Sequence, residues 1–188
     1  MSDEMRARTA HVFYLRFREE EVTPKASETT LKGRKLLSHV LRTRYGIEDD
    51  PLEIKTHERG KPYLPKHPEI EYNISHSGRY IVLAVASVPV GIDVQEIRIT
   101  SIDKLGRHVF SDSEYRDFLM SEDRQEAFFR MWVRKEAYIK WTGDGLYREL
   151  RELPLDGWFQ YITIDRGYYC AIHAGIPLSV EVEEVTLP

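Results

Sequence analysis

Four residues spaced four apart combine packing and charge on one face of a predicted helix. The stretch from 125 to 146 has helical periodicity, with these residues at i, i+4, i+8 and i+12: Phe128, Trp132, Glu136 and Lys140. Aromatic side chains are ordinary on a buried face, but an unpaired buried charge is costly. The pattern predicts that this face leaves the core at its Glu136–Lys140 end, or that the two charges meet partners there.

A second acidic residue, Asp93, follows the apolar run that begins at residue 80. It lies between Ile92 and Val94, so in a strand its side chain points away from both. A carboxylate placed in this way, paired with a glutamate on a helix, suits a hard cation such as Mg²⁺. Oxygen ligands around a partly hydrated cation are typical of phosphate chemistry.

The segment NISHSG at 73–78 is a polar interruption between two strand-like runs. Ser75, His76 and Ser77 offer hydroxyls, an imidazole and backbone N–H groups, all of which can bind phosphate or metal. The other interpretation is a simple turn, because Ser, Asn and His are common in turns of β proteins. The segment alone leaves both open.

Composition limits the class of protein. The chain has 188 residues and a formal net charge of −4, which fits one or two small domains with a real core. No apolar run is long enough for a membrane helix, and the single Cys170 excludes an intrachain disulfide framework and a multi-Cys zinc site. We expect a cytoplasmic location and no membrane contact, because the sequence shows neither an apolar signal core nor a run of membrane length. We expect no nucleic-acid partner, because the chain is mildly acidic.

The order of predicted elements indicates two similar halves. Helices are expected at 31–46, at 97–109, from Ser111 and from 125, and strands at 11–17, 52–56, 80–94 as a hairpin, 157–166, 167–175 and 178–187. This order is β-α-β-β followed by α-α-β-β-β. The halves would join near residues 95–101.

Five short motifs occur in one order along the chain. They are GKP at 60–62, NISHS at 73–77, GIDVQ at 91–95, FSDSE at 110–114 and WVRKEAYIK at 132–140. Together they resemble the 4′-phosphopantetheinyl transferase superfamily, in its Sfp-like branch. The resemblance implies an α+β fold of two similar lobes related by a pseudo-twofold, each a small, mostly antiparallel sheet packed by helices. The implied lobes are 1–96 and 97–188, in a monomer.

The resemblance also implies a reaction. The 4′-phosphopantetheine group of coenzyme A would move to a serine hydroxyl of an apo acyl- or peptidyl-carrier protein, releasing 3′,5′-ADP. Asp93 and Glu136 resemble the carboxylates that hold Mg²⁺, with Mn²⁺ as an alternative, on the pyrophosphate of coenzyme A. Glu136 also resembles the group that deprotonates the serine, and Lys140 the lysine that contacts the phosphates.

Further positions carry over as a binding site for coenzyme A. Lys61 and Pro62 resemble the loop over the adenine and its 3′-phosphate, and Ser75 and His76 resemble residues that grip coenzyme A. Gln95 stands where the family often has a glutamate. As a metal ligand it offers a carbonyl oxygen without charge, so we expect weaker or altered metal binding.

Two other functions use the same residues. One is a coenzyme A- or nucleotide-binding homologue that acts as a regulatory or binding module without transfer, which Gln95 supports. The other is a metal-dependent phosphodiesterase, for which the sequence lacks a His-rich two-metal cluster. For the transferase, the basic segments 32–44 and 104–107 are candidate surfaces for an acidic carrier protein of fatty-acid, polyketide or nonribosomal-peptide biosynthesis.

Overall fold

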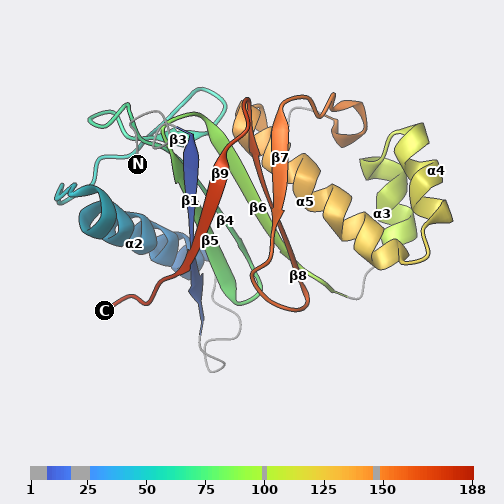
Figure 1. Cartoon of the computed structure of the whole chain (residues 1–188), viewed down its shortest axis with the longest axis horizontal. Helices are drawn as coiled ribbons and strands as arrows, with labels where there is room; N and C mark the ends of the chain where they lie inside the picture. Colours follow the sequence, from blue (N-terminus) through green and yellow to red (C-terminus); the bar gives the residue numbers. More distant parts are fainter. Residues whose placement is uncertain (1–7, 18–25, 99–100, 146–148) are drawn as a thin grey trace.

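The computed structural model describes residues 8–17, 26–98, 101–145 and 149–188. These residues form an α+β structure in which helices lie on either side of small sheets (Figure 1). The predicted fold class is confirmed. No helix in the described ranges has the length and apolar character needed to cross a membrane.

The first sheet has strand order β4-β5-β1-β9. Its strands are β1 (Thr9–Arg16), β4 (Glu71–Ser77), β5 (Tyr80–Ala86) and β9 (Ser179–Glu184). Strand β5 pairs antiparallel with both β1 and β4, whereas β9 pairs parallel with β1. Helix α2 (Ala26–Tyr45) covers one face, where Leu37 and Leu41 belong to the same buried cluster as Phe13 and Leu83.

The second sheet has the antiparallel order β6-β8-β7. Its strands are β6 (Val90–Glu96), β7 (Trp158–Ile162) and β8 (Tyr168–Ala174). Alternate residues of β6 point to opposite sides of the strand, one set toward the first sheet and the other toward a helix. Ile92 and Val94 join a buried cluster with Val12 and Val82 of the first sheet. The other side of β6, which carries Asp93, faces the long helix α5 (Arg124–Thr142).

Helix α5 (Arg124–Thr142) agrees closely with the predicted long helix. Asp123 caps its start by accepting a hydrogen bond from the Glu126 N–H. Gly143 ends it in the left-handed conformation, with φ of 73°. Two short helices lie beside α5: α3 (Ile102–Val109) and α4 (Asp112–Met120). The remaining described elements are the 3₁₀ turn η3 (Leu150–Glu152) and a two-stranded ribbon of β2 (Lys55–Thr56) and β3 (Pro62–Tyr63).

Four local expectations differ from the structure. The hairpin at 80–94 does not form, because β5 and β6 are consecutive but pair in different sheets. The segment 73–77 is part of a regular strand, and the turn falls at Gly78, whose φ is 54°. The strand at 52–56 shortens to two residues, and the helix at 97–109 begins only at Ile102.

The two halves repeat one topology. In each, a strand and a helix precede an antiparallel hairpin whose second strand returns to pair with the first, giving β4-β5-β1 and β7-β8-β6. This is consistent with the expected two-lobed arrangement. The lobe boundary at residue 96 stays a prediction, since β6 precedes it yet pairs with β8, and β9 follows it yet pairs with β1. Residues 99 and 100 of the expected junction lie outside the described ranges.

A buried histidine lies where α5 packs on the second sheet. His173 on β8 is fully buried, and neither ring nitrogen has a hydrogen-bond partner among the described residues. Trp141 stacks on the imidazole at 5.0 Å between ring centroids, and Tyr138 meets it edge-on at 5.0 Å. Burial, and then the nearby Arg134 charge, lower the pKa of His173 to about 4.

His173 should therefore make stability depend on pH. Its folded pKa of about 4 lies below the ordinary 6.5, so the unfolded chain binds more protons in this window. Stability should fall as pH drops from 6.5 toward 4, by on the order of 3 kcal/mol from this group. We expect His173→Phe to flatten that part of the profile in urea titrations from pH 7 to 4. An unchanged slope in the variant would contradict the assignment.

Candidate active site

The site lies where the first sheet meets β6. Alternate side chains of β4 point at the free edge of β6 and accept hydrogen bonds from its backbone N–H groups. These bonds replace the backbone hydrogen bonds that would join two paired strands. The acceptor and donor pairs are Asn73 Oδ1 with Ile92 N at 2.9 Å, Ser75 Oγ with Val94 N at 3.3 Å, and Ser77 Oγ with Glu96 N at 3.0 Å. The polar motif at 73–77 thus joins the two sheets, because it satisfies backbone donors that would otherwise be buried.

Asp93 is the buried centre of the site, with 6% of its surface exposed. Its Oδ1 accepts hydrogen bonds from Ser75 Oγ at 2.7 Å and from Lys140 Nζ at 2.6 Å. Lys140 also donates to Ser75 Oγ at 2.8 Å. The cluster thus takes one group each from β6, β4 and α5, and charge-assisted hydrogen bonds close it.

Glu136 lies one helical turn before Lys140 and is half-buried. Burial raises its pKa, the negative charge of Asp93 raises it further, and Lys140 opposes both effects. The side-chain carboxylate of Glu136 makes no hydrogen bond or ion pair with any residue that the structure describes. Of the two alternatives that the sequence left open, the charged end of the helix face fits the second for Lys140, which meets Asp93 and Ser75. Glu136 is placed as a desolvated carboxylate beside the Asp93–Lys140 pair.

The close approach of α5 to β6 depends on Gly91. A Cβ atom at this position would collide with the Ala137 carbonyl oxygen and the Trp141 backbone nitrogen. Any larger residue would push the helix off the strand, at a cost of roughly 1–3 kcal/mol or more. The first residue of GIDVQ therefore sets the separation between the carboxylate of Asp93 and the helix that carries Glu136 and Lys140.

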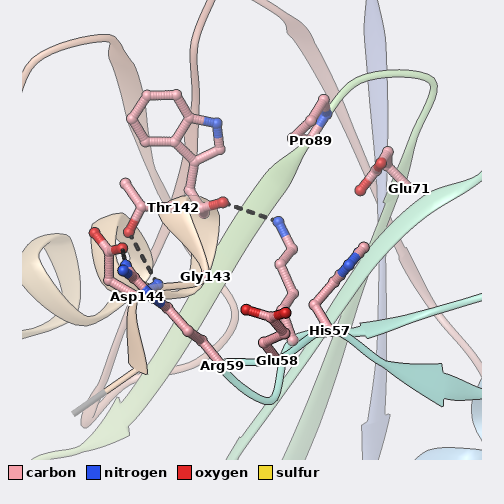
Figure 2. A pocket seen from close by; sticks show the side chains of 10 residues that line it. His57, Glu58, Arg59, Glu71, Pro89, Thr142, Gly143 and Asp144 are labelled. Atoms are coloured by element: carbon pink, nitrogen blue, oxygen red, sulfur yellow. Dashed lines mark hydrogen bonds and ion pairs between the residues drawn. The ribbon is translucent and has the colours of Figure 1, made fainter. Parts of the chain in front are cut away.

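Two hollows open beside this cluster. A smaller one of about 180 Å³ is lined by Lys61, Pro62, Asn73 and Lys140, among others. A larger one of about 710 Å³ adjoins it, and Figure 2 shows His57, Glu58, Arg59 and Glu71 facing Thr142, Gly143 and Asp144 across it. The Arg59 and Asp144 side chains form an ion pair between the two sides. The predicted residues of the 60–62 loop and Lys140 are thus brought together.

Five predicted site residues do not line either hollow: Ser75, His76, Asp93, Gln95 and Glu136. Of these, His76 makes no hydrogen bond with the Asp93–Ser75–Lys140 cluster. It is exposed on β4, where strand alternation turns it away from Ser75. Desolvation and the Lys140 charge lower its pKa, whereas Asp93 raises it. His76 is therefore within electrostatic reach of the cluster without contacting it.

A divalent cation fits the carboxylates of this site. The described ranges contain no group of three or more His, Cys, Asp or Glu side chains able to hold a metal ion. Mg²⁺, however, commonly uses one or two carboxylates and takes its remaining ligands from water and substrate phosphates. Asp93 and Glu136 supply two such carboxylates. Gln95 is half-buried, and its Nε2 donates to the Glu96 carbonyl oxygen at 3.1 Å.

Sequence reasoning missed a buried ion pair behind the site. Lys135, next to Glu136, is fully buried and donates to Glu114 Oε2 at 2.7 Å and to the Leu150 carbonyl oxygen at 2.8 Å. Glu114 also forms a capping box with Ser111 at the start of α4. The available signal was that FSDSE supplies a carboxylate and WVRKEAYIK a lysine outside the charged face.

Removing the Glu114 charge should unfold the protein more easily. In Glu114→Gln the Lys135 ammonium stays buried without a counter-charge, so we expect a loss of about 3–5 kcal/mol in unfolding free energy. Glu126→Gln is the matched control, because its pair with Arg130 is exposed and should change stability by about 0.5 kcal/mol at most. Urea titration checks both. Equal losses in the two variants would contradict the buried pair.

The comparisons with known proteins cover most of the chain. Residues 16–88 match the family model "4′-phosphopantetheinyl transferase, N-terminal", and residues 89–176 match the "4′-phosphopantetheinyl transferase superfamily" model. The two matches meet between β5 and β6, where the chain passes from one sheet to the other.

Similar proteins carry the same description. A 4′-phosphopantetheinyl transferase of Bacillus subtilis is 39% identical over 129 residues, which are 68% of this chain and 55% of that protein. The 4′-phosphopantetheinyl transferase ffp of Bacillus subtilis is 33% identical over 161 residues, 85% of this chain and 65% of that protein. The chain spans about half the length of the first curated relatives it matches.

One solved structure gives a weaker likeness. The holo-[acyl-carrier-protein] synthase of Thermotoga maritima has a TM-score of 0.37 and 23% identity, over 45% of this chain and 61% of that one. The family assignment rests on the two sequence models and the Bacillus relatives. On these matches, the chain belongs to the 4′-phosphopantetheinyl transferase superfamily, in its Sfp-like branch.

Proposed function

We propose that this protein transfers the 4′-phosphopantetheine group of coenzyme A to a serine hydroxyl of an apo acyl- or peptidyl-carrier protein. The new bond joins the serine oxygen to the phosphorus that carries pantetheine, and the bond broken is the pyrophosphate P–O bond, so that 3′,5′-ADP leaves. Family membership supports this reaction, and so do the names of the relatives. The observation that carries it is Glu136, whose carboxylate has no hydrogen-bond partner among the described residues and lies beside the Asp93–Ser75–Lys140 cluster.

The described charges suit a displacement at phosphorus. Such a reaction needs positioning and charge neutralisation more than covalent help from the protein. Lys140 is held by Ser75 and Asp93 at the edge of the smaller hollow, where it would face the phosphates of a bound coenzyme A. The fixed ammonium would stabilise negative charge on the oxygen that leaves with ADP.

Asp93 and Glu136 would hold Mg²⁺, or Mn²⁺ in its place, with Gln95 as a neutral third ligand through its side-chain oxygen. When bound, the cation would neutralise charge on the pyrophosphate. Asp93 is pre-oriented for this role by the hydrogen bond from Ser75. Gln95 adds no charge, which supports weaker binding than three carboxylates would give.

Glu136 would also accept the proton of the attacking serine. A serine hydroxyl is a weak nucleophile, so a base near its oxygen is needed. Because burial and Asp93 raise the pKa of Glu136, this carboxylate is a stronger base than an exposed glutamate. Pro62 and His76 would contact the nucleotide of coenzyme A. The serine of the carrier protein would approach the phosphorus opposite the oxygen that leaves with 3′,5′-ADP.

Intact-mass spectrometry tests the transfer. An apo carrier protein incubated with this protein, coenzyme A and Mg²⁺ should gain one phosphopantetheine, about 340 Da from its composition. Glu136→Gln should slow the gain by at least roughly 10²-fold, because the base and a metal ligand are lost together. Gln95→Glu should speed it if the missing carboxylate limits metal binding. Binding of coenzyme A without mass gain, across several carriers, would favour the non-transferring binding module.

Thermal melting tests the metal site separately. With coenzyme A present, Mg²⁺ at ten times its Kd should raise the Tm of the wild type by roughly 3 °C. Asp93→Asn and Glu136→Gln should lose this rise, while Glu126→Gln, changed on the exposed start of the same helix, should keep it. A rise that survives in Asp93→Asn would place the cation elsewhere.

A further inference from the structure

The loop before β3 is closed on itself and reaches across to the second sheet. The His57 N–H donates to the Lys61 carbonyl oxygen and the Gly60 N–H to the His57 carbonyl oxygen, both at 2.9 Å. These bonds fold residues 57–61 into a tight turn. The Lys61 side chain extends from this turn toward the end of α5.

The Lys61 ammonium is bound by backbone carbonyls of two elements. Its Nζ donates to the Trp141 carbonyl oxygen at 2.9 Å and to the Val90 carbonyl oxygen at 3.3 Å. The first lies in the last turn of α5 and the second in the first residue of β6. The aliphatic stem packs beside Gly143, where an added Cβ would come within 3.3 Å of Lys61 Cδ. The residue therefore touches three segments at once.

The contacts of the Lys61 ammonium favour a structural role for this residue. The last carbonyls of a helix have no intrahelical partner and carry partial negative charge, so a lysine there is stabilising. Burial lowers the pKa of Lys61, and the Glu71 charge opposes this effect. Two of the three ammonium hydrogens are already used. A phosphate would have to compete for this ammonium with two buried carbonyl oxygens.

Both anchor points lie close to groups of the site. Trp141 follows Lys140, and Val90 precedes Asp93 by three residues on the same strand. Between them, the helix and strand touch at Gly91 with no room for a side chain. A group that joins Trp141 to Val90 therefore fixes the separation of the elements that carry Lys140 and Asp93.

We infer that Lys61 is a positioning residue: it clamps the end of α5 to the start of β6, and so holds Lys140 against Asp93, instead of binding a phosphate of coenzyme A. This deepens the proposed function and rests on it for its effect on the rate. It assigns the 60–62 loop a second purpose, since the same turn that lines the smaller hollow also ties helix α5 to β6.

The test uses Lys61→Met, which keeps the stem and removes the donors. Amide hydrogen exchange should rise about tenfold or more in the last turn of α5 and at the start of β6, with α2 unchanged. At saturating coenzyme A, well below the Tm, kcat should fall roughly tenfold or more, because Lys140 is misplaced. The ratio of kcat/KM for coenzyme A over 3′-dephospho-coenzyme A should stay within about twofold of wild type, a ratio that loss of a phosphate ligand would change.

Lys66→Met is the matched control, because this lysine of the same connecting segment is exposed and lies 3.9 Å from Asp49. It should leave exchange and kcat unchanged. If Lys61→Met does not fold, Lys61→Gln, which keeps one shorter donor group, should give intermediate exchange and an unchanged substrate ratio.

Unchanged exchange in α5 and β6, or a substrate ratio that collapses toward one, would overturn the clamp. The exchange measurement needs no activity. If the wild type transfers nothing to any carrier, raised exchange in Lys61→Met would still support the clamp, and only the proposed function would fail.

Discussion

The structure depends on the row of side-chain hydrogen bonds by which β4 satisfies the free edge of β6. Asn73, Ser75 and Ser77 replace a neighbouring backbone with three oxygen atoms spaced two residues apart. Backbone ladders would have fused the sheets into one and buried the strand edge completely. Side-chain acceptors instead leave a junction in which Ser75 can also bind Asp93 and Lys140, so the seam between the sheets becomes the site.

Helix α5 carries buried charges with two different fates. Lys135 is paired with Glu114 and also donates to a carbonyl oxygen, which fixes the helix against α4. Glu136, the next residue, has no partner within the described part of the chain, and its pKa is raised. Lys140 offsets only part of the cost of burying this carboxylate, and the proposed binding of a cation and phosphates would give a reason for keeping it.

Packing geometry and chemistry are coupled through small contacts. Gly91 allows the helix backbone to touch β6, and Lys61 holds the two ends of that contact together. His173 and Trp141 fill the space behind the same turn with aromatic surface. Each of these residues lies outside the Asp93–Lys140 pair, yet each limits how far α5 can move relative to β6.

The sequence by itself determined the elements with a strong period or a strong stop signal. Helix α5, its charged face and its end at Gly143 follow from residue spacing, and the motif order indicated the family and the two similar halves. The tertiary structure decided which strands pair. A local pattern cannot show that β5 and β6, adjacent in the chain, belong to different sheets, that β9 returns to β1, or that Ser75 points at Asp93. Those contacts join residues far apart in sequence, and only the packed fold brings them within hydrogen-bonding distance.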